Sequence, residues 1–183
     1  MRKAPNYTLG NAVDGIWKQE LLTYLGKTFN LSTLIETGTC DGGTLGAIYQ
    51  NFSDIHTIEL SEYYYNISVE RFKNIQHIKL YKGDSAKILR KILHETPDVP
   101  TLFWLDAHPS GGLTADCDDP LPAEIQTIIE LRPNSLIVID DQQNDLLQNV
   151  IDAGVNIDGW IKEFRTGVVF LHNGSYQIPE FKD

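Results

Sequence analysis

The sequence predicts one α/β domain over residues 1–183, built on a doubly wound, mainly parallel sheet of seven strands. Five short apolar runs, rich in residues that favour strands, alternate with segments that have helical spacing of apolar residues. Parallel strands need such helical crossovers, because a hairpin cannot join them. With 183 residues, 42% of them hydrophobic and 22% charged, the chain can bury a core of this kind.

The expected elements follow in order along the chain. A helical segment over residues 11–29 comes first. The five parallel strands are expected at 33–37, 55–60, 77–84, 101–108 and 135–141, and the helices between them at 44–52, 62–74, 85–95 and 122–131. After an apolar segment at 146–154, two strands at 159–174 are joined around Thr166 and Gly167. This predicts a C-terminal antiparallel hairpin.

Charge and cysteine content limit the partners and the compartment. Fifteen basic and 25 acidic residues give a formal charge of −10, which argues against a nucleic acid partner but not against a small cation or a metal. The two cysteines, Cys40 and Cys117, have neither zinc-site spacing nor a disulfide framework. No signal peptide or membrane-length apolar run is visible. We therefore expect a soluble cytoplasmic protein with no membrane partner.

Polar residues stand at the carboxyl end of every expected parallel strand, which is where open α/β sheets bind ligands. In strand order they are Glu36 and Gly38, then Glu59, then Asp84, then Asp106 and His108, and finally Asp140 and Asp141. A single aspartate there is ordinary, because aspartate caps helices. Five such ends in succession predict that the strand ends build one site.

The first strand runs into a glycine loop, "ETGTCDGGT", that matches neither common phosphate-binding motif. Cys40 replaces the middle glycine of the dinucleotide motif, and no lysine follows Gly43 as a P-loop requires. Gly42, Gly43 and Thr44 open the next helix, where glycine allows close approach of a ligand and the helix N-terminus favours an anionic group. A carboxylate-bearing ligand fits this loop better than a phosphate.

Two acidic residues add to the description of the ligand. Glu59 lies about 20 residues beyond Gly38, at the spacing from which an acidic side chain reaches ribose hydroxyls. Glu36, two residues before Gly38, could meet an ammonium group. The expected ligand therefore carries a ribose, a carboxylate and an ammonium.

These motifs resemble those of class I S-adenosylmethionine (SAM)-dependent methyltransferases, over nearly the whole chain. "IETGTCDGGT" is similar to the first motif of that family, "IEL" to the second and "GDS" to the third. The resemblance implies a Rossmann-like sheet and SAM as the cofactor. It implies that Glu36, Gly38 and Gly42 flank the methionine part, that Glu59 binds the ribose, and that Asp84 and Ser85 lie near the adenine.

Within this class, "LDAH…IVIDD" is similar to metal-dependent O-methyltransferases, including those that act on catechols and macrolide sugars. The resemblance implies a Mg²⁺ ion held by Asp106, Asp140 and Asp141. His108, two residues beyond Asp106, is on the same side of an extended strand, and we expect it to serve as the general base. The implied activity is Mg²⁺-assisted O-methylation of a small hydroxylated acceptor, such as a sugar or a natural product.

Several alternatives stay open. The chain lacks the longer N-terminal region of many such enzymes, so the pocket must be covered by residues 1–30, by the loop 108–122, or by a second subunit of a homodimer. His108 could act without a metal or be structural, and Asp141 could merely cap a helix. A non-catalytic nucleotide-binding or interaction module is possible on the same fold. A metal-dependent hydrolase would leave the glycine loop unexplained.

Overall fold

The computed structural model describes residues 16–107, 118–140, 146–165 and 167–179. The strands are β1 (Thr33–Thr37), β2 (Asp54–Glu59), β3 (Ile78–Lys82), β4 (Thr101–Leu105), β5 (Leu136–Asp140), β6 (Ile161–Arg165) and β7 (Val168–His172). The helices are α1 (Ile16–Thr28), α2 (Gly43–Ile48), η1 (Tyr49–Asn51), α3 (Glu62–Phe72), α4 (Ser85–Glu95), α5 (Leu121–Leu131) and α6 (Leu146–Asp152). Within the described residues, no helix has the length and apolar character needed to cross a membrane.

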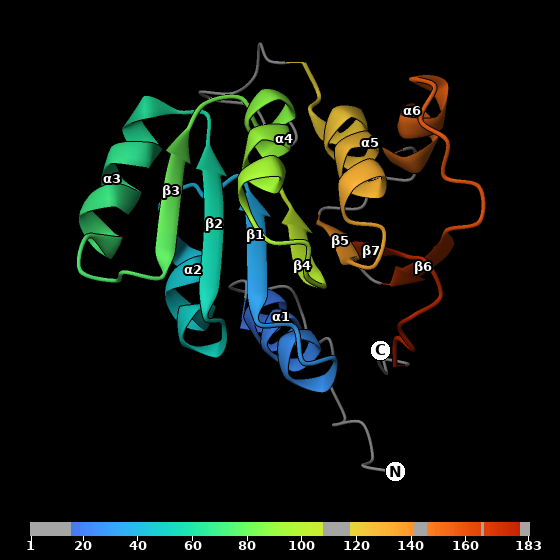
Figure 1. The fold of residues 1–183 in the computed structure, drawn as a ribbon. Helices are drawn as coiled ribbons and strands as arrows, with labels where there is room; N and C mark the ends of the chain where they lie inside the picture. The colour runs from blue at the N-terminus through green and yellow to red at the C-terminus, as the bar shows by residue number, and fades with distance from the viewer. Residues whose placement is uncertain (1–15, 108–117, 141–145, 166, 180–183) are drawn as a thin grey trace.

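All seven strands form one sheet in the order β3-β2-β1-β4-β5-β7-β6 (Figure 1). Strands β1 to β5 are parallel, whereas β7 runs antiparallel to both β5 and β6. The predicted sheet and its C-terminal hairpin are therefore confirmed. The strand order reverses direction between β1 and β4, and this switch point is where such sheets bind ligands.

Side chains alternate between two buried layers, one on each face of the sheet. One layer packs against α1, α2 and α3, and its strand residues include Leu34, Trp104 and Val138. The other packs against α4, α5 and α6, with Ile35 and Phe103 among its members. Helices on both faces explain why β1, β4 and β5 are buried along their whole length.

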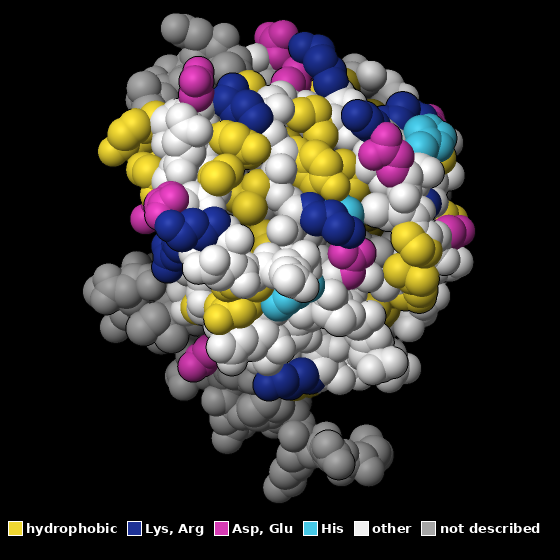
Figure 2. All heavy atoms as spheres, turned by 60° about the vertical axis from the view of Figure 1, so that its left-hand side comes forward, with side chains coloured by type: hydrophobic (Ala, Val, Ile, Leu, Met, Phe, Trp, Pro, Cys, Tyr) yellow, Lys and Arg dark blue, Asp and Glu magenta, His cyan; other side chains and the backbone are white. Residues whose placement is uncertain are grey.

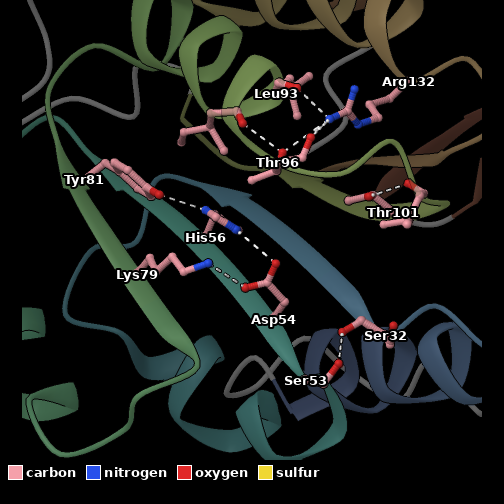
Figure 3. A network of polar contacts seen from close by, with 12 residues as sticks. Ser32, Ser53, Asp54, His56, Lys79, Tyr81, Leu93, Thr96, Thr101 and Arg132 are labelled. Carbon is pink, nitrogen blue, oxygen red and sulfur yellow. Dashed lines mark hydrogen bonds and ion pairs between the residues drawn. The ribbon is translucent and has the colours of Figure 1, made fainter.

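Two polar networks on the α4 side serve the fold (Figure 3). The buried ring of His56 lies between the hydroxyl of Tyr81, 2.9 Å from Nδ1, and the carboxylate of Asp54, 3.2 Å from Nε2. Burial lowers the pKa of His56. The guanidinium of Arg132 donates to the carbonyl oxygens of Leu93 and Thr96 at 2.6 and 2.8 Å, where α4 ends. These bonds satisfy carbonyls that a helix end leaves without partners.

The edge strand β3 carries charged side chains toward solvent. Lys79 is exposed and pairs with Asp54 at 3.0 Å, and Lys82 is also exposed. Figure 2 shows this side of the molecule, with basic, acidic and apolar side chains interspersed. Lysines on an edge strand oppose pairing with a second sheet.

Candidate functional site

Four of the expected site residues form one row across neighbouring strands. Thr37 pairs with Ile58 and with Leu105, and Leu105 pairs with Ile139. One residue further along, the same register places Glu59, Gly38, Asp106 and Asp140 side by side at the carboxyl ends of β2, β1, β4 and β5. By the alternation of side chains, the row belongs to the face that α1, α2 and α3 cover. From end to end it spans three strand spacings, roughly 14 Å.

Gly38 lies at the centre of this row and allows the β1 and β4 loops to touch. Its φ of +84° is in the left-handed region. A Cβ at this position would lie 2.2 Å from the carbonyl oxygen of Asp106. Only glycine fits here, because any side chain would push apart the two strand ends that form the switch point.

Helix α3 holds the glycine loop in place through hydrogen bonds and packing. The hydroxyl of Ser68 donates to the carbonyl oxygen of Cys40 at 2.9 Å, and Arg71 donates to that of Asp41 at 3.0 Å. Gly42, at a φ of +76°, leaves room for the ring of Phe72, which a Cβ would approach to 2.5 Å. Cys40 has a φ of +51°, so the residue that replaces the motif's middle glycine still adopts a glycine-like conformation.

Glu59 is almost fully buried, and its carboxylate joins the ends of β1 and β2. Oε2 accepts from the backbone N–H of Cys40 at 2.7 Å, and Oε1 accepts from that of Ser61 at 2.6 Å. Each carboxylate oxygen can accept a second hydrogen bond. Glu59 can therefore organise the loop and receive two ligand hydroxyls at the same time.

Glu36 lies beneath the loop and is only 2% exposed. Its Oε2 accepts from the hydroxyl of Thr57 at 2.6 Å. Burial raises the pKa of Glu36 to about 7, an effect that the Thr57 hydrogen bond opposes and the negative charge of Glu59 adds to. A cation above this carboxyl would favour its ionised form.

We expect the Glu36→Gln variant to flatten part of the pH dependence of stability. The folded protein holds the Glu36 proton up to about pH 7, whereas the unfolded chain releases it near the ordinary pKa of 4.5. The resulting stabilisation is complete below pH 4.5 and is lost as pH rises to 7, a loss of about 3 kcal/mol. Urea unfolding across this range should show that the free energy of unfolding of Glu36→Gln rises relative to that of wild type as the pH rises. Glu62→Gln, at an exposed position, should show no such rise. A difference in unfolding free energy between Glu36→Gln and wild type that stays constant with pH would contradict the prediction.

The remaining residues of the expected cofactor site lie beside the row. The Asp84 carboxylate caps α4 by accepting from the N–H of Ala86 at 3.0 Å, and it pairs with Lys87 at 2.8 Å. Ser85 is buried. Gly43 opens α2, but its N–H already donates to the carboxylate of Asp41 at 2.9 Å, and Thr44 follows half-buried. The first N–H group of the short α2 therefore already has a hydrogen-bond acceptor, the carboxylate of Asp41.

Glu124 of α5 is a second buried carboxyl near these strand ends, and no sequence motif pointed to it. Burial raises its pKa to about 7, and the hydroxyls of Ser85 and Thr37 oppose that shift. Its spacing was a signal that could have found it, because Glu124 comes three residues after Leu121 and four before Ile128, on the buried face of α5.

At the other end of the row, Asp140 is fully buried and its Oδ2 forms an ion pair with Nζ of Lys18 from α1. Asp106 is half-buried. Within the described parts of the chain, no cluster of three or more His, Cys, Asp or Glu side chains could hold a metal ion. The two expected ligands that the structure describes therefore do not by themselves form a metal site, and one of them already has a cation.

Two expected site residues lie outside the described residues, namely His108 and Asp141. The same holds for residues 108–117 of the loop expected to cover the pocket, and for residues 1–15. Lys18, by contrast, was missed by sequence reasoning. The only feature of the sequence that pointed to Lys18 as a site residue was its position next to Trp17, in the segment expected to cover the pocket.

No protein-family model and no curated protein matches the sequence. Solved structures do match. The SAH (S-adenosylhomocysteine)-bound methyltransferase PaMTH1 of Podospora anserina is 14% identical with a TM-score of 0.65, over 87% of this chain and 79% of that one. The O-methyltransferase TomG of Streptomyces achromogenes, bound to SAM, is 17% identical with a TM-score of 0.63, over 89% and 82%. A Bacillus cereus O-methyltransferase bound to SAH is 18% identical with a TM-score of 0.62, over 89% and 83%.

At identities of 14–18%, this likeness shows the fold. The chain has the class I SAM-dependent methyltransferase fold. The fold expected from its motifs is therefore confirmed. A fold alone does not determine a function, which depends on the residues of the site.

Proposed function

We propose that the protein is a SAM-dependent methyltransferase that acts on a hydroxyl group of a small molecule. The observation that carries this proposal is the row of Glu59, Gly38, Asp106 and Asp140 at the switch point of a methyltransferase fold. It supplies a carboxylate for ribose at one end, a close backbone approach in the middle, and two carboxylates for an acceptor at the other.

In this proposal the cofactor lies along the glycine loop. Glu59 receives the ribose hydroxyls, and Glu36 faces the positive charge of the methionine part. A raised pKa suits that role, because the bound cation would draw Glu36 into its ionised form and release a proton near pH 7. Gly38, Gly42 and the Gly43–Thr44 turn line the loop. Asp84 and Ser85 lie toward the adenine.

The reaction is an in-line displacement. The acceptor oxygen attacks the sulfonium methyl, the carbon–sulfur bond breaks with its electron pair left on sulfur, and the acceptor proton passes to a base. His108 is the proposed base, two residues beyond Asp106. Holding the two reactants in line can supply about 7–11 kcal/mol of the barrier reduction. The segment before residue 30 and the loop 108–122 are proposed to cover the acceptor.

A second version of the function uses Mg²⁺ at Asp106, Asp140 and Asp141. It is favoured by the placement of Asp106 and Asp140 at matching positions of neighbouring strands. When bound, Mg²⁺ would orient the acceptor hydroxyl and lower its pKa. The ion pair between Lys18 and Asp140 argues against it, because an ammonium on Oδ2 of Asp140 repels a second cation close to the same carboxylate.

Calorimetric titration of SAH into the protein, once with EDTA and once with Mg²⁺, tests the proposal. We expect saturable binding under both conditions. Because SAH keeps the ammonium, binding near pH 7 should also release protons, seen as a dependence of the heat on the buffer. Absence of SAH binding under both conditions would overturn the methyltransferase assignment and favour an interaction module on the same fold.

A further inference from the structure

The ion pair between Lys18 and Asp140 joins residues 122 positions apart in the chain. Asp140 is fully buried, and the Lys18 side chain is 22% exposed. Nζ of Lys18 also lies 5.9 Å from the ring centroids of both Trp17 and Trp104, at a distance typical of cation–π contacts. The ammonium thus lies against a carboxylate and two aromatic rings, on a side chain that keeps part of its surface exposed.

This ammonium lies at the acceptor end of the row. Asp140 stands beside Asp106 on the neighbouring strand, and Trp104 lies two residues before Asp106 on the same face. It is the position at which a divalent metal would otherwise contact Asp140. A cation beside a buried carboxylate stabilises its ionised form, and an ammonium can serve in this way as a metal can.

We propose that the Lys18 ammonium takes the place of a divalent metal at the acceptor end and binds the acceptor oxygen directly. The proposal rests on the proposed function. Lys18 keeps all its protons during methyl transfer and donates a hydrogen bond to the oxygen, whose own proton leaves to a base. A positive charge beside that oxygen stabilises the charge that develops there. Trp17, which reaches the turn at Gly167, fixes the helix that carries the lysine.

Titration with Mn²⁺, followed by electron paramagnetic resonance of the free ion, tests the proposal without a methyl acceptor. Wild type should bind Mn²⁺ no better than Lys27→Met, a matched control at an exposed position of the same helix. Lys18→Met should bind Mn²⁺ at least about tenfold more tightly, because the competing charge is gone. Adding Asp140→Asn should cancel that gain, and Lys18→Arg should behave like wild type. Wild-type binding as tight as that of Lys18→Met would overturn the proposal.

Two further measurements keep the test decisive. If Lys18→Met does not fold, the ¹⁵N ammonium signal of Lys18 in wild type should be unchanged by Mg²⁺, and a shift on adding Mg²⁺ would contradict the proposal. Calorimetry with SAH should give the same affinity for wild type and Lys18→Arg. Failure of wild type to bind SAH would overturn the proposed function, whereas the Mn²⁺ result would still report on Lys18.

Discussion

Replacing Glu59 by alanine should weaken SAH binding by about 100-fold or more, the effect of losing two hydrogen bonds to a charged group. The same change removes the acceptor for the backbone N–H groups of Cys40 and Ser61, at 2.7 and 2.6 Å. The loop is therefore expected to loosen as well. Calorimetry would measure the affinity, and thermal unfolding the stability.

Glu62→Ala is the matched control, because Glu62 is an exposed glutamate three residues further on, in the first turn of α3. It should leave SAH affinity unchanged and cost only a few tenths of a kcal/mol in stability. Glu59→Gln keeps one acceptor oxygen and should fall between alanine and wild type. Wild-type affinity in a folded Glu59→Ala protein would exclude Glu59 as the ribose ligand.

Replacing Gly38 by alanine should lower the free energy of unfolding by about 3 kcal/mol or more, through steric overlap and backbone strain together. The new Cβ would stand 2.2 Å from the carbonyl oxygen and 2.7 Å from the carbonyl carbon of Asp106, which are backbone atoms that cannot rotate away. Relief requires β1 and β4 to separate at their carboxyl ends. Urea unfolding would measure the loss, and SAH affinity should fall with it.

Gly154→Ala separates the two causes. Gly154 has a φ of +86°, close to the +84° of Gly38, but a Cβ there would meet nothing within 4 Å. Its substitution should therefore cost only the left-handed conformation, about 1–2 kcal/mol. Equal losses for the two variants would show that the contact between Gly38 and Asp106 is not what restricts this position.

The fold was predictable because its signals are local. Helices α1 to α5 and all seven strands fall where apolar spacing and turn residues placed them, with bounds shifted by a few residues. The site was predictable in part for a related reason. Parallel strands joined by helices bring their carboxyl ends to one edge, so polar residues at those ends must gather, as Glu59, Gly38, Asp106 and Asp140 do.

The local sequence pattern could not predict the pKa values of the buried carboxyl groups. The raised pKa values of Glu36 and Glu124, about 7 in each case, come from burial by elements distant in sequence. The left-handed φ of Cys40 could not be foreseen either, because a cysteine does not favour that conformation, and the contacts of α3 with the loop hold it there.

The sequence by itself determined the order of the strands along the chain, the position of the glycine loop and the edge of the sheet at which the polar residues gather. Only the tertiary structure decided the charge at the acceptor end. Lys18 meets Asp140 across 122 residues because α1 packs on the same face of the sheet toward which Asp140 points. Periodicity gives the face of each strand, but which helix covers that face depends on how all the side chains pack together.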